Sequence, residues 1–203
     1  MKDKILLYTA ITGNYEQPRD DIRVETSDLF KLSVRDARMH KCLTPDFDKY
    51  DYSIWIDGNT SLKVSPEFLI KELGDADILV YSHWRDCVYD EGRVVEKIVD
   101  GKHGEFEAIM YQMIRYKEEG YPNHNGLAVT TYVIRRHNKA VAAFNNLWWA
   151  EISKGSERDQ LSFNYAIWKL GNIKLKYFEE KHFDIHRDNT YFNYVLHNEK
   201  LTQ

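Results

Sequence analysis

Short apolar runs alternate along this sequence with longer segments in which apolar residues recur at helical spacing. The apolar runs are bounded by turn residues and predict buried strands at residues 4–12, 52–56, 78–82, 129–134 and 173–178. Strands that alternate with helices predict an α/β domain, in which a mixed central sheet is flanked by helices on both faces.

The helical segments carry their own boundary signals. Predicted helices cover residues 35–43, 105–119, 138–154 and 157–170. A further helix is expected to begin at Pro66, with Ser65 as its N-cap. Residues 14–32 are polar and irregular, so no element is predicted there.

Length and composition limit the class of protein. The chain has 203 residues, of which 43% are hydrophobic and 30% charged, and this predicts one folded domain over residues 1–203 with a C-terminal tail or lid at 181–203. The net charge of −4 disfavours a nucleic-acid-binding domain. Cys42 and Cys87 lack the spacing of a metal motif and are expected to be free thiols in a reducing compartment. The apolar run at residues 5–8 is too short for a signal peptide or a membrane anchor, so we expect a cytoplasmic location.

The tripeptide Asp57-Gly58-Asn59 is the most informative local pattern. It follows a buried strand, and ligands of open α/β sheets bind at the carboxyl ends of strands. The carboxylate of Asp57 and the amide oxygen of Asn59 are ligands that suit Mg²⁺ or Mn²⁺. Such an ion can bridge two phosphates and neutralise a leaving diphosphate. An ordinary turn that closes a hairpin is the competing interpretation.

The loop after the first strand is expected at the same edge of the sheet. The residues predicted to line a nucleotide pocket there are Thr9, Ala10, Thr12, Gly13, Asn14 and Tyr15. Asn125 and Gly126 precede the strand predicted at 129–134 and are included in the same group.

Two further segments hold candidate catalytic residues. Arg85 and Asp86 follow the strand predicted at 78–82, where an arginine can clamp a phosphate or a pair of sugar hydroxyls, although a solvated loop with local ion pairs explains them as well. Asp159 and Gln160 open a helix. The helix dipole alone favours an acidic residue at this position. The pair could also contact a sugar, Asp159 through a carboxylate that accepts hydrogen bonds and Gln160 through its side-chain amide.

His182 and His186 lie in the C-terminal tail. Either imidazole could add a nitrogen ligand to a metal ion held by Asp57, and a structural role is equally open.

Taken together, these segments resemble a known family, the glycosyltransferase-like domain named after plant turgor-regulation and mucilage proteins. The matching stretches run in order from residue 4 to about residue 170. Two of them are specific, namely residues 55–59 (WIDGN) and 158–163 (RDQLSF). The other matching stretches are residues 8–15, 83–91, 119–122, 125–127, 135–138 and 148–149. The resemblance implies a GT-A-like fold and a transferase that uses a nucleotide sugar.

The order of the motifs also resembles the retaining GT-A enzymes of the glycogenin and galactosyltransferase type. In this analogy Asp57 and Asn59 stand for the DxD metal ligands, and His182 or His186 for the last ligand. Asp159 and Gln160 stand for the pair that contacts the donor sugar. The analogy implies a divalent ion, Mn²⁺ or Mg²⁺, a nucleoside-diphosphate sugar such as a UDP-sugar as donor, and a retaining outcome rather than an inverting one.

Two departures from the family pattern leave questions open. Asn59 replaces a carboxylate, which weakens the charge of the metal site, and the segment between Tyr15 and Arg35 is short, which leaves the base specificity open. The acceptor is also open, and a glycan, a protein and a modified nucleic acid all remain.

Two other functions compete with glycosyl transfer. One is a metal-dependent hydrolase, because at least one plant relative of the family is described as a ceramidase. The other is a nucleotide- or carbohydrate-binding module without catalysis. A hydrolytic zinc site prefers three ligands rich in histidine. Only two histidines, His182 and His186, accompany Asp57 in the expected site, so transfer is favoured.

Overall fold

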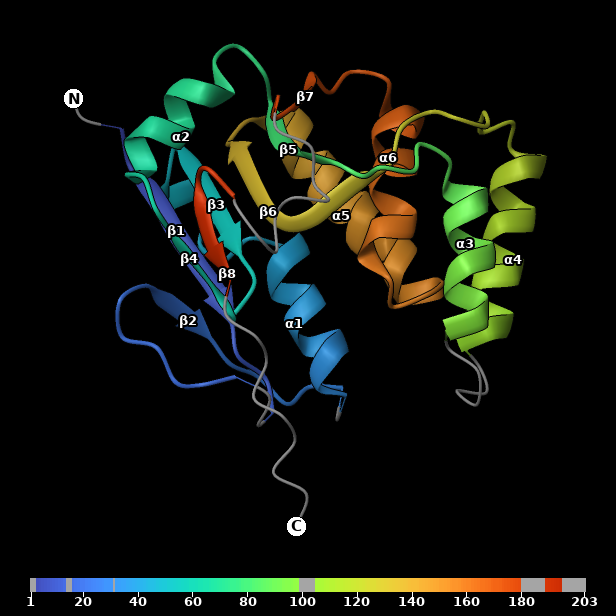
Figure 1. The fold of residues 1–203 in the computed structure, drawn as a ribbon, viewed down its shortest axis with the longest axis horizontal. Helices are drawn as coiled ribbons and strands as arrows, with labels where there is room; N and C mark the ends of the chain where they lie inside the picture. Colours follow the sequence, from blue (N-terminus) through green and yellow to red (C-terminus); the bar gives the residue numbers. More distant parts are fainter. Residues whose placement is uncertain (1–2, 14–15, 31, 99–104, 180–188, 195–203) are drawn as a thin grey trace.

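The computed structural model describes residues 3–13, 16–30, 32–98, 105–179 and 189–194. Its main strands are β1 (Ile5–Ala10), β2 (Arg23–Glu25), β3 (Tyr52–Ile56), β5 (Ile78–Ser82), β6 (Ala128–Arg136) and β7 (Leu175–Tyr177). These strands form one sheet in the order β2-β1-β3-β6-β5-β7 (Figure 1).

The directions of the strands make the sheet mixed. β1 pairs in parallel with β2 and β3, and β5 pairs in parallel with β7, whereas β6 runs antiparallel to both β3 and β5. Because β6 runs against β3, its first half lies beside the carboxyl end of β3. The backbone N–H of Asp57 donates to the carbonyl of Thr131 at 3.0 Å. The prediction of an α/β fold with a mixed central sheet and flanking helices is confirmed.

Helices cover both faces of the sheet. One face packs against α1 (Ser33–Cys42), α5 (Lys139–Lys154) and α6 (Asp159–Leu170). The other face packs against α2 (Pro66–Leu73) and against β8 (Phe192–Tyr194), which pairs with β4 (Thr60–Leu62). The remaining helices, α3 (Val88–Ile98) and α4 (Glu105–Glu118), lie side by side at the other end of the molecule from β2 (Figure 1).

Strand β3 shows how the sequence produces these two layers. Side chains alternate between the faces of a strand. Ile54 and Ile56 accordingly join the core under α2, while Trp55 joins the core under α1. A shift of one residue would exchange the two sets, so burial on both faces fixes the register.

Several predicted helix boundaries agree with the structure. Ser65 caps α2 by accepting a hydrogen bond from the N–H of Phe68 at 3.2 Å, and Asn138 caps α5 by accepting from Val141 at 2.9 Å. The elements that were not predicted include β2, β4, β8 and α3. Strand β2 lies in the segment that looked irregular, and α3 begins inside the segment after β5 that read as a loop.

The turn at Asp57 does not close a hairpin. The N–H of Thr60 donates to the carbonyl of Asp57 at 3.0 Å, so a tight turn is present. However, β3 pairs with β1 and β6, and the next strand, β4, pairs with β8. The turn therefore places Asp57 at the carboxyl end of β3, an inner strand of the sheet.

Candidate active site

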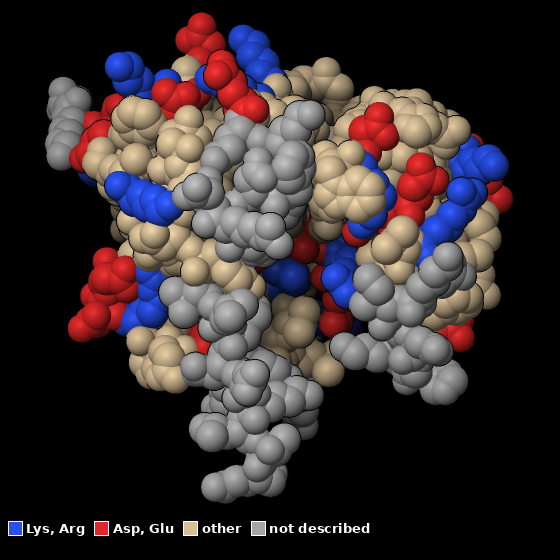
Figure 2. Space-filling view, in the orientation of Figure 1, with Lys and Arg blue, Asp and Glu red and all other residues tan. Residues whose placement is uncertain are grey.

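A cavity of about 360 Å³ lies at the carboxyl ends of β1 and β3, beside α1. Its lining comes from separate parts of the chain: Ala10, Ile11, Thr12, Glu16, Ser33, Val34, Ala37, Arg38, Trp55, Asp57, Gly58, Asn59, Thr131 and Tyr194. Figure 2 shows acidic and basic atoms together in a recess near the middle of the molecule. The volume lies in the usual range for a small-molecule site.

Asp57, with Glu16, is one of two carboxylates in the described lining. Its side chain is 31% exposed, and its Oδ1 accepts a hydrogen bond from the indole N–H of Trp55 at 2.8 Å. The ammonium group of Lys41 lies 3.3 Å from the same oxygen. Both contacts use Oδ1, so the carboxylate is held in one orientation at the cavity.

Lys41 is buried directly behind the cavity. Its side chain is only 1% exposed, and its Nζ lies 2.7 Å from Oδ2 of Asp159 in addition to its contact with Asp57. One ammonium group thus joins the carboxylate at the end of β3 to the carboxylate at the start of α6. These two residues belong to the two most specific segments of the sequence.

Arg135 explains why α1 places Lys41 there. This arginine is fully buried, and its guanidinium donates to the carbonyls of Lys41 at 2.9 Å and Cys42 at 3.2 Å. The last carbonyls of a helix have no partner within the helix, and a cation there is favourable. Arg135 therefore fixes the end of α1 against β6, and with it the position of Lys41.

Asp159 is a buried, ionised carboxylate. Burial alone would raise its pKa, but the charges of Arg38 and Lys41 and the hydrogen bonds from Lys41 and Thr130 hold the pKa below its ordinary value. The hydroxyl of Thr130 donates to Oδ2 at 2.8 Å. The side chain is shielded from solvent and does not line the cavity, so in this structure Asp159 supports the site from behind.

Arg38 is the cation that reaches the cavity. Burial would lower its pKa, but the carboxylates of Asp159 and Asp57 raise it, so the guanidinium stays charged. Its Nε lies 3.4 Å from Oδ1 of Asp159. That Nε is buried and makes no hydrogen bond within the described part of the structure. A buried donor without a partner next to a cavity is well suited to an anionic ligand.

The residues predicted to line a nucleotide pocket after the first strand lie in different places. Ala10 and Thr12 line the cavity, and the hydroxyl of Thr12 donates to the carbonyl of Ser33. Gly13 has a φ of 78° in the loop that follows. Thr9 is fully buried and does not line the cavity. Asn14 and Tyr15 lie outside the described residues, as do His182 and His186.

Arg85 and Asp86 do not line the cavity of Asp57. Arg85 forms an ion pair with Glu91, and its guanidinium stacks on Trp84 with its central carbon 3.9 Å from the ring centroid. Asp86 pairs with His124 at 2.7 Å. The side chains of both residues thus form local contacts near the start of α3. Gln160 follows Asp159 in the first turn of α6 and also does not line the cavity.

Asn125 and Gly126 lie before β6 and away from this cavity. Gly126 has a φ of 80°, and a side chain added there would come within 2.9 Å of the hydroxyl of Tyr177 and 3.3 Å of the amide nitrogen of Asn164. Asn164 in turn accepts a hydrogen bond from the N–H of Ala128 at 2.7 Å. In the structure Gly126 therefore allows the close packing of this turn against α6 and β7.

A Gly126→Ala variant tests this packing role. The control is Gly120→Ala, because Gly120 has a similar φ of 84° with nothing within 4 Å of an added side chain. The control is expected to lose about 1 kcal/mol of folding free energy from backbone strain alone. Gly126→Ala should lose about 1–3 kcal/mol more through overpacking. Equal losses in urea denaturation would show that the contacts with Tyr177 and Asn164 are unimportant.

Sequence reasoning missed Lys41 and Arg38. Both lie in a short helix with a mixed composition, where charged residues normally face solvent. Their spacing of i and i+3 places them on one side of the helix, and this was the signal that could have been used. It gains meaning only when α1 is known to pack beside Asp57 and Asp159.

The described part of the C-terminal tail reaches the cavity. Residues 192–194 form β8, and Tyr194 is part of the cavity lining. The side-chain oxygen of Asn189 accepts hydrogen bonds from the hydroxyl of Tyr81 at 3.0 Å and from the N–H of Phe192 at 3.0 Å.

Comparisons with known proteins place the chain among glycosyltransferase-like proteins. A family model described as "TOD1/MUCI70, glycosyltransferase-like domain" matches residues 24–192. No curated protein matches the sequence significantly. Within the described residues, no helix combines the length and the apolar character needed to cross a membrane.

Solved structures show only distant likeness. The bifunctional glycosyltransferase WbbM in its apo form has 10% identity and a TM-score of 0.47, over 95% of this chain and 45% of that one. A197 from STIV has 9% identity and a TM-score of 0.42, over 86% and 81% of the two chains. Core-mannan synthase A (CmsA/Ktr4) from Aspergillus fumigatus in an Mn/GDP form has 12% identity and a TM-score of 0.39, over 73% and 46%. The chain thus spans less than half of the length of WbbM and of the mannan synthase.

Proposed function

Because the chain belongs to the TOD1/MUCI70 glycosyltransferase-like family, we propose that it transfers a sugar from a nucleoside-diphosphate sugar bound in the cavity of Asp57. The observation that carries the proposal is the buried ammonium of Lys41, which joins Asp57 at the cavity to Asp159 behind it. A site whose groups are fixed before the substrate arrives is a general requirement of electrostatic catalysis. A UDP-sugar is the first donor to test.

Arg38 is the natural partner of the diphosphate. It lies at the cavity with a charged guanidinium, whose buried Nε–H makes no hydrogen bond among the described residues and has only the ion-pair contact with Asp159 at 3.4 Å. Guanidinium groups bind phosphate oxygens through directed hydrogen bonds. As the bond between sugar and diphosphate breaks, negative charge grows on the leaving phosphate, and a cation held at that point stabilises the transition state.

The cavity also offers ligands to a divalent ion. Oδ1 of Asp57 is engaged by Trp55 and Lys41, so Oδ2 is the oxygen that a metal would take, and the side-chain oxygen of Asn59 is the second candidate. Oxygen ligands of this kind suit Mn²⁺ or Mg²⁺. A bound ion would add positive charge next to the diphosphate. Because Lys41 already lies 3.3 Å from Asp57, the protein supplies part of that charge itself.

Asp159 is better suited to positioning than to proton transfer. A general base works best when its pKa lies near the working pH, whereas ion pairs hold the pKa of Asp159 below its ordinary value. It is also buried behind the cavity. These features favour a retaining reaction, in which the leaving phosphate can accept the proton of the acceptor.

The proposal includes a single domain over residues 1–203 whose tail at 181–203 acts as a lid. It is supported by β8, which brings Tyr194 to the cavity. His182 or His186 would then approach Asp57 when the lid closes. The acceptor, whether glycan, protein or modified nucleic acid, would enter from the open side of the cavity.

Hydrolysis and binding without catalysis are less favoured. A hydrolytic zinc site prefers three ligands rich in histidine and an open position. The described lining contributes two carboxylates, an amide and a guanidinium, from Asp57, Glu16, Asn59 and Arg38, and no histidine. Charged groups that are held in fixed positions around a cavity suit the stabilisation of a transition state, which a module that only binds its ligand does not need.

The test of the proposal is an Asp57→Ala variant. We expect it to lose binding of UDP with Mn²⁺ by at least about tenfold, because the metal and the orientation of the phosphates depend on this carboxylate. The fold should persist, since Lys41 keeps its ion pair with Asp159. Isothermal titration calorimetry with UDP, with and without Mn²⁺, measures the effect.

Asp48→Ala is the matched control, because it removes an exposed carboxylate that does not line the cavity. It should bind UDP and Mn²⁺ as the original protein does. Unchanged affinity in Asp57→Ala would remove Asp57 from the donor site. Transfer activity that survives in that variant would show a transferase with a donor site elsewhere.

A further inference from the structure

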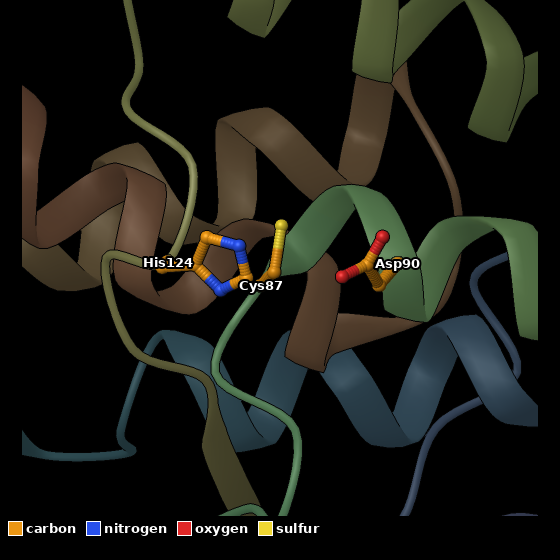
Figure 3. A group of neighbouring side chains, drawn as sticks. All are labelled: Cys87, Asp90 and His124. Carbon is orange, nitrogen blue, oxygen red and sulfur yellow. The ribbon is translucent and has the colours of Figure 1, made fainter.

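A second group of potential metal ligands lies outside the cavity of Asp57. Cys87, Asp90 and His124 place a sulfur, a carboxylate oxygen and a ring nitrogen within 4.8 Å of one another. Figure 3 shows the imidazole of His124, the thiol of Cys87 and the carboxylate of Asp90 gathered at the start of α3. None of the three lines the cavity of Asp57.

The backbone brings these side chains together from two segments. Cys87 immediately precedes α3, and Asp90 lies in its first turn, so their spacing of i and i+3 places both on one side of the helix. His124 belongs to the loop between α4 and β6 and has a φ of 53°. This left-handed conformation is uncommon for residues other than glycine and is often found at functional sites.

The imidazole already has the support that metal-binding histidines need. Its Nδ1 lies 2.7 Å from Oδ1 of Asp86. When Nδ1 carries the proton that is donated to this carboxylate, Nε2 is left with the lone pair that a metal requires. A carboxylate on the far nitrogen of the ring is the usual second partner of a zinc-bound histidine.

The ligand types select the ion. A thiolate and an imidazole suit Zn²⁺ far better than Mg²⁺ or Mn²⁺, which prefer oxygen. Cys87 is 3% exposed, whereas the side chains of Asp90 and His124 are 47% and 63% exposed, so the site is reached from solvent. Arg93, 3.3 Å from Asp90, is the one ion-pair partner that the described structure gives this carboxylate, and the contact is exposed and easily exchanged.

We propose that Cys87, Asp90 and His124 bind one Zn²⁺ ion, with Asp86 orienting His124 and a water molecule in the fourth position. On binding, the thiol of Cys87 loses its proton to solvent, and no other bond changes. The ion would fasten the loop before β6 to the start of α3. It is separate from any Mn²⁺ or Mg²⁺ ion at Asp57.

Cobalt is the probe for this site, because Co²⁺ replaces Zn²⁺ and a thiolate ligand gives it a charge-transfer absorption in the near ultraviolet. We expect the protein, freed of metal by a chelator, to develop this band with one equivalent of Co²⁺ and to lose it when Zn²⁺ is added. Cys87→Ser should abolish the band. Cys42→Ala, which removes the other, fully buried cysteine, should keep it.

Two further variants guard against misfolding as an explanation. His124→Gln changes an exposed side chain and should lose the band with an unchanged circular dichroism spectrum. Asp86→Asn should keep the band and weaken Co²⁺ affinity by about 10–100-fold, the usual effect of losing the second partner of a ligand. A band that is absent from the original protein, or that survives in Cys87→Ser, overturns the proposal. Co²⁺ binding that shows no thiolate band and is lost in Asp57→Ala also overturns it, since the metal then occupies only the other cavity.

Discussion

A Lys41→Met variant is expected to lose about 3–5 kcal/mol of folding free energy, because it removes one partner of a buried ion pair and leaves Asp159 without its nearest cation. We also expect kcat/KM to fall by about 10²–10³-fold, the effect of losing one fixed electrostatic group in an active site. Without the ammonium group, Asp57 and Asp159 are no longer held together, and Arg38 becomes the only described cation within 4.0 Å of Asp159. Urea denaturation and steady-state kinetics measure the two effects.

The loss of stability and the loss of activity can be separated. The double variant Lys41→Met/Asp159→Asn removes both charges, so it should regain part of the lost stability while its activity stays low. Lys49→Met is the surface control, since Lys49 is 73% exposed and pairs with Asp46 at 2.8 Å. It should change stability by less than about 1 kcal/mol. Near-normal turnover and stability in Lys41→Met would contradict the role given to this residue.

An Asp159→Asn variant is expected to lower kcat by about 10²–10⁴-fold, the range for a lost base or a lost fixed polar contact. Asparagine keeps the shape of the side chain and can still accept from Thr130, but it no longer neutralises Lys41 and Arg38. Glu157→Gln is the control, because Glu157 is a neighbouring acid in only a loose pair with Arg35 at 3.9 Å. Near-normal turnover in Asp159→Asn would leave Asp159 as a residue that only favours the start of its helix.

The same variant distinguishes two mechanisms. If Asp159 only positions other groups, its protonation should not shape the pH profile, because its pKa is already below its ordinary value. Any fall of kcat/KM on acidification should then be the same in the original enzyme and in Asp159→Asn. A limb of the pH profile that disappears in the variant would show that Asp159 acts as the base. NMR of the product then gives the configuration of the new bond. An anomer opposite to that of the donor would show inversion.

Local signals in the sequence were sufficient to place Asp57. A buried strand followed by glycine predicts a chain that turns at the edge of a sheet, and β3 ends there with Asp57 at a cavity. The N-caps at Ser65 and Asn138 are equally local, because each depends on a bond to the third residue along.

Contacts between distant segments were beyond such reasoning. Strand β2 has three residues, and it is stabilised by pairing with β1 rather than by its own pattern. The pairing of β4 with β8 joins Thr60 to Tyr194 across most of the chain. Lys41 looks like an ordinary surface lysine until Arg135 fixes the end of α1 beside β6. The sequence therefore shows the charged residues of the site, but it does not show that they lie next to one another in the fold.

The two outer strands of the described six-stranded sheet are both only three residues long, namely β2 and β7. The edge of a sheet exposes N–H and C=O groups to which a strand of another molecule can add. In β2, Arg23 and Glu25 pair with each other at 2.5 Å, and β7 carries Lys176 at its centre. Short edges with charged side chains give a neighbouring molecule little backbone to extend. This arrangement opposes fibrous aggregation at the high protein concentrations that calorimetry and NMR require.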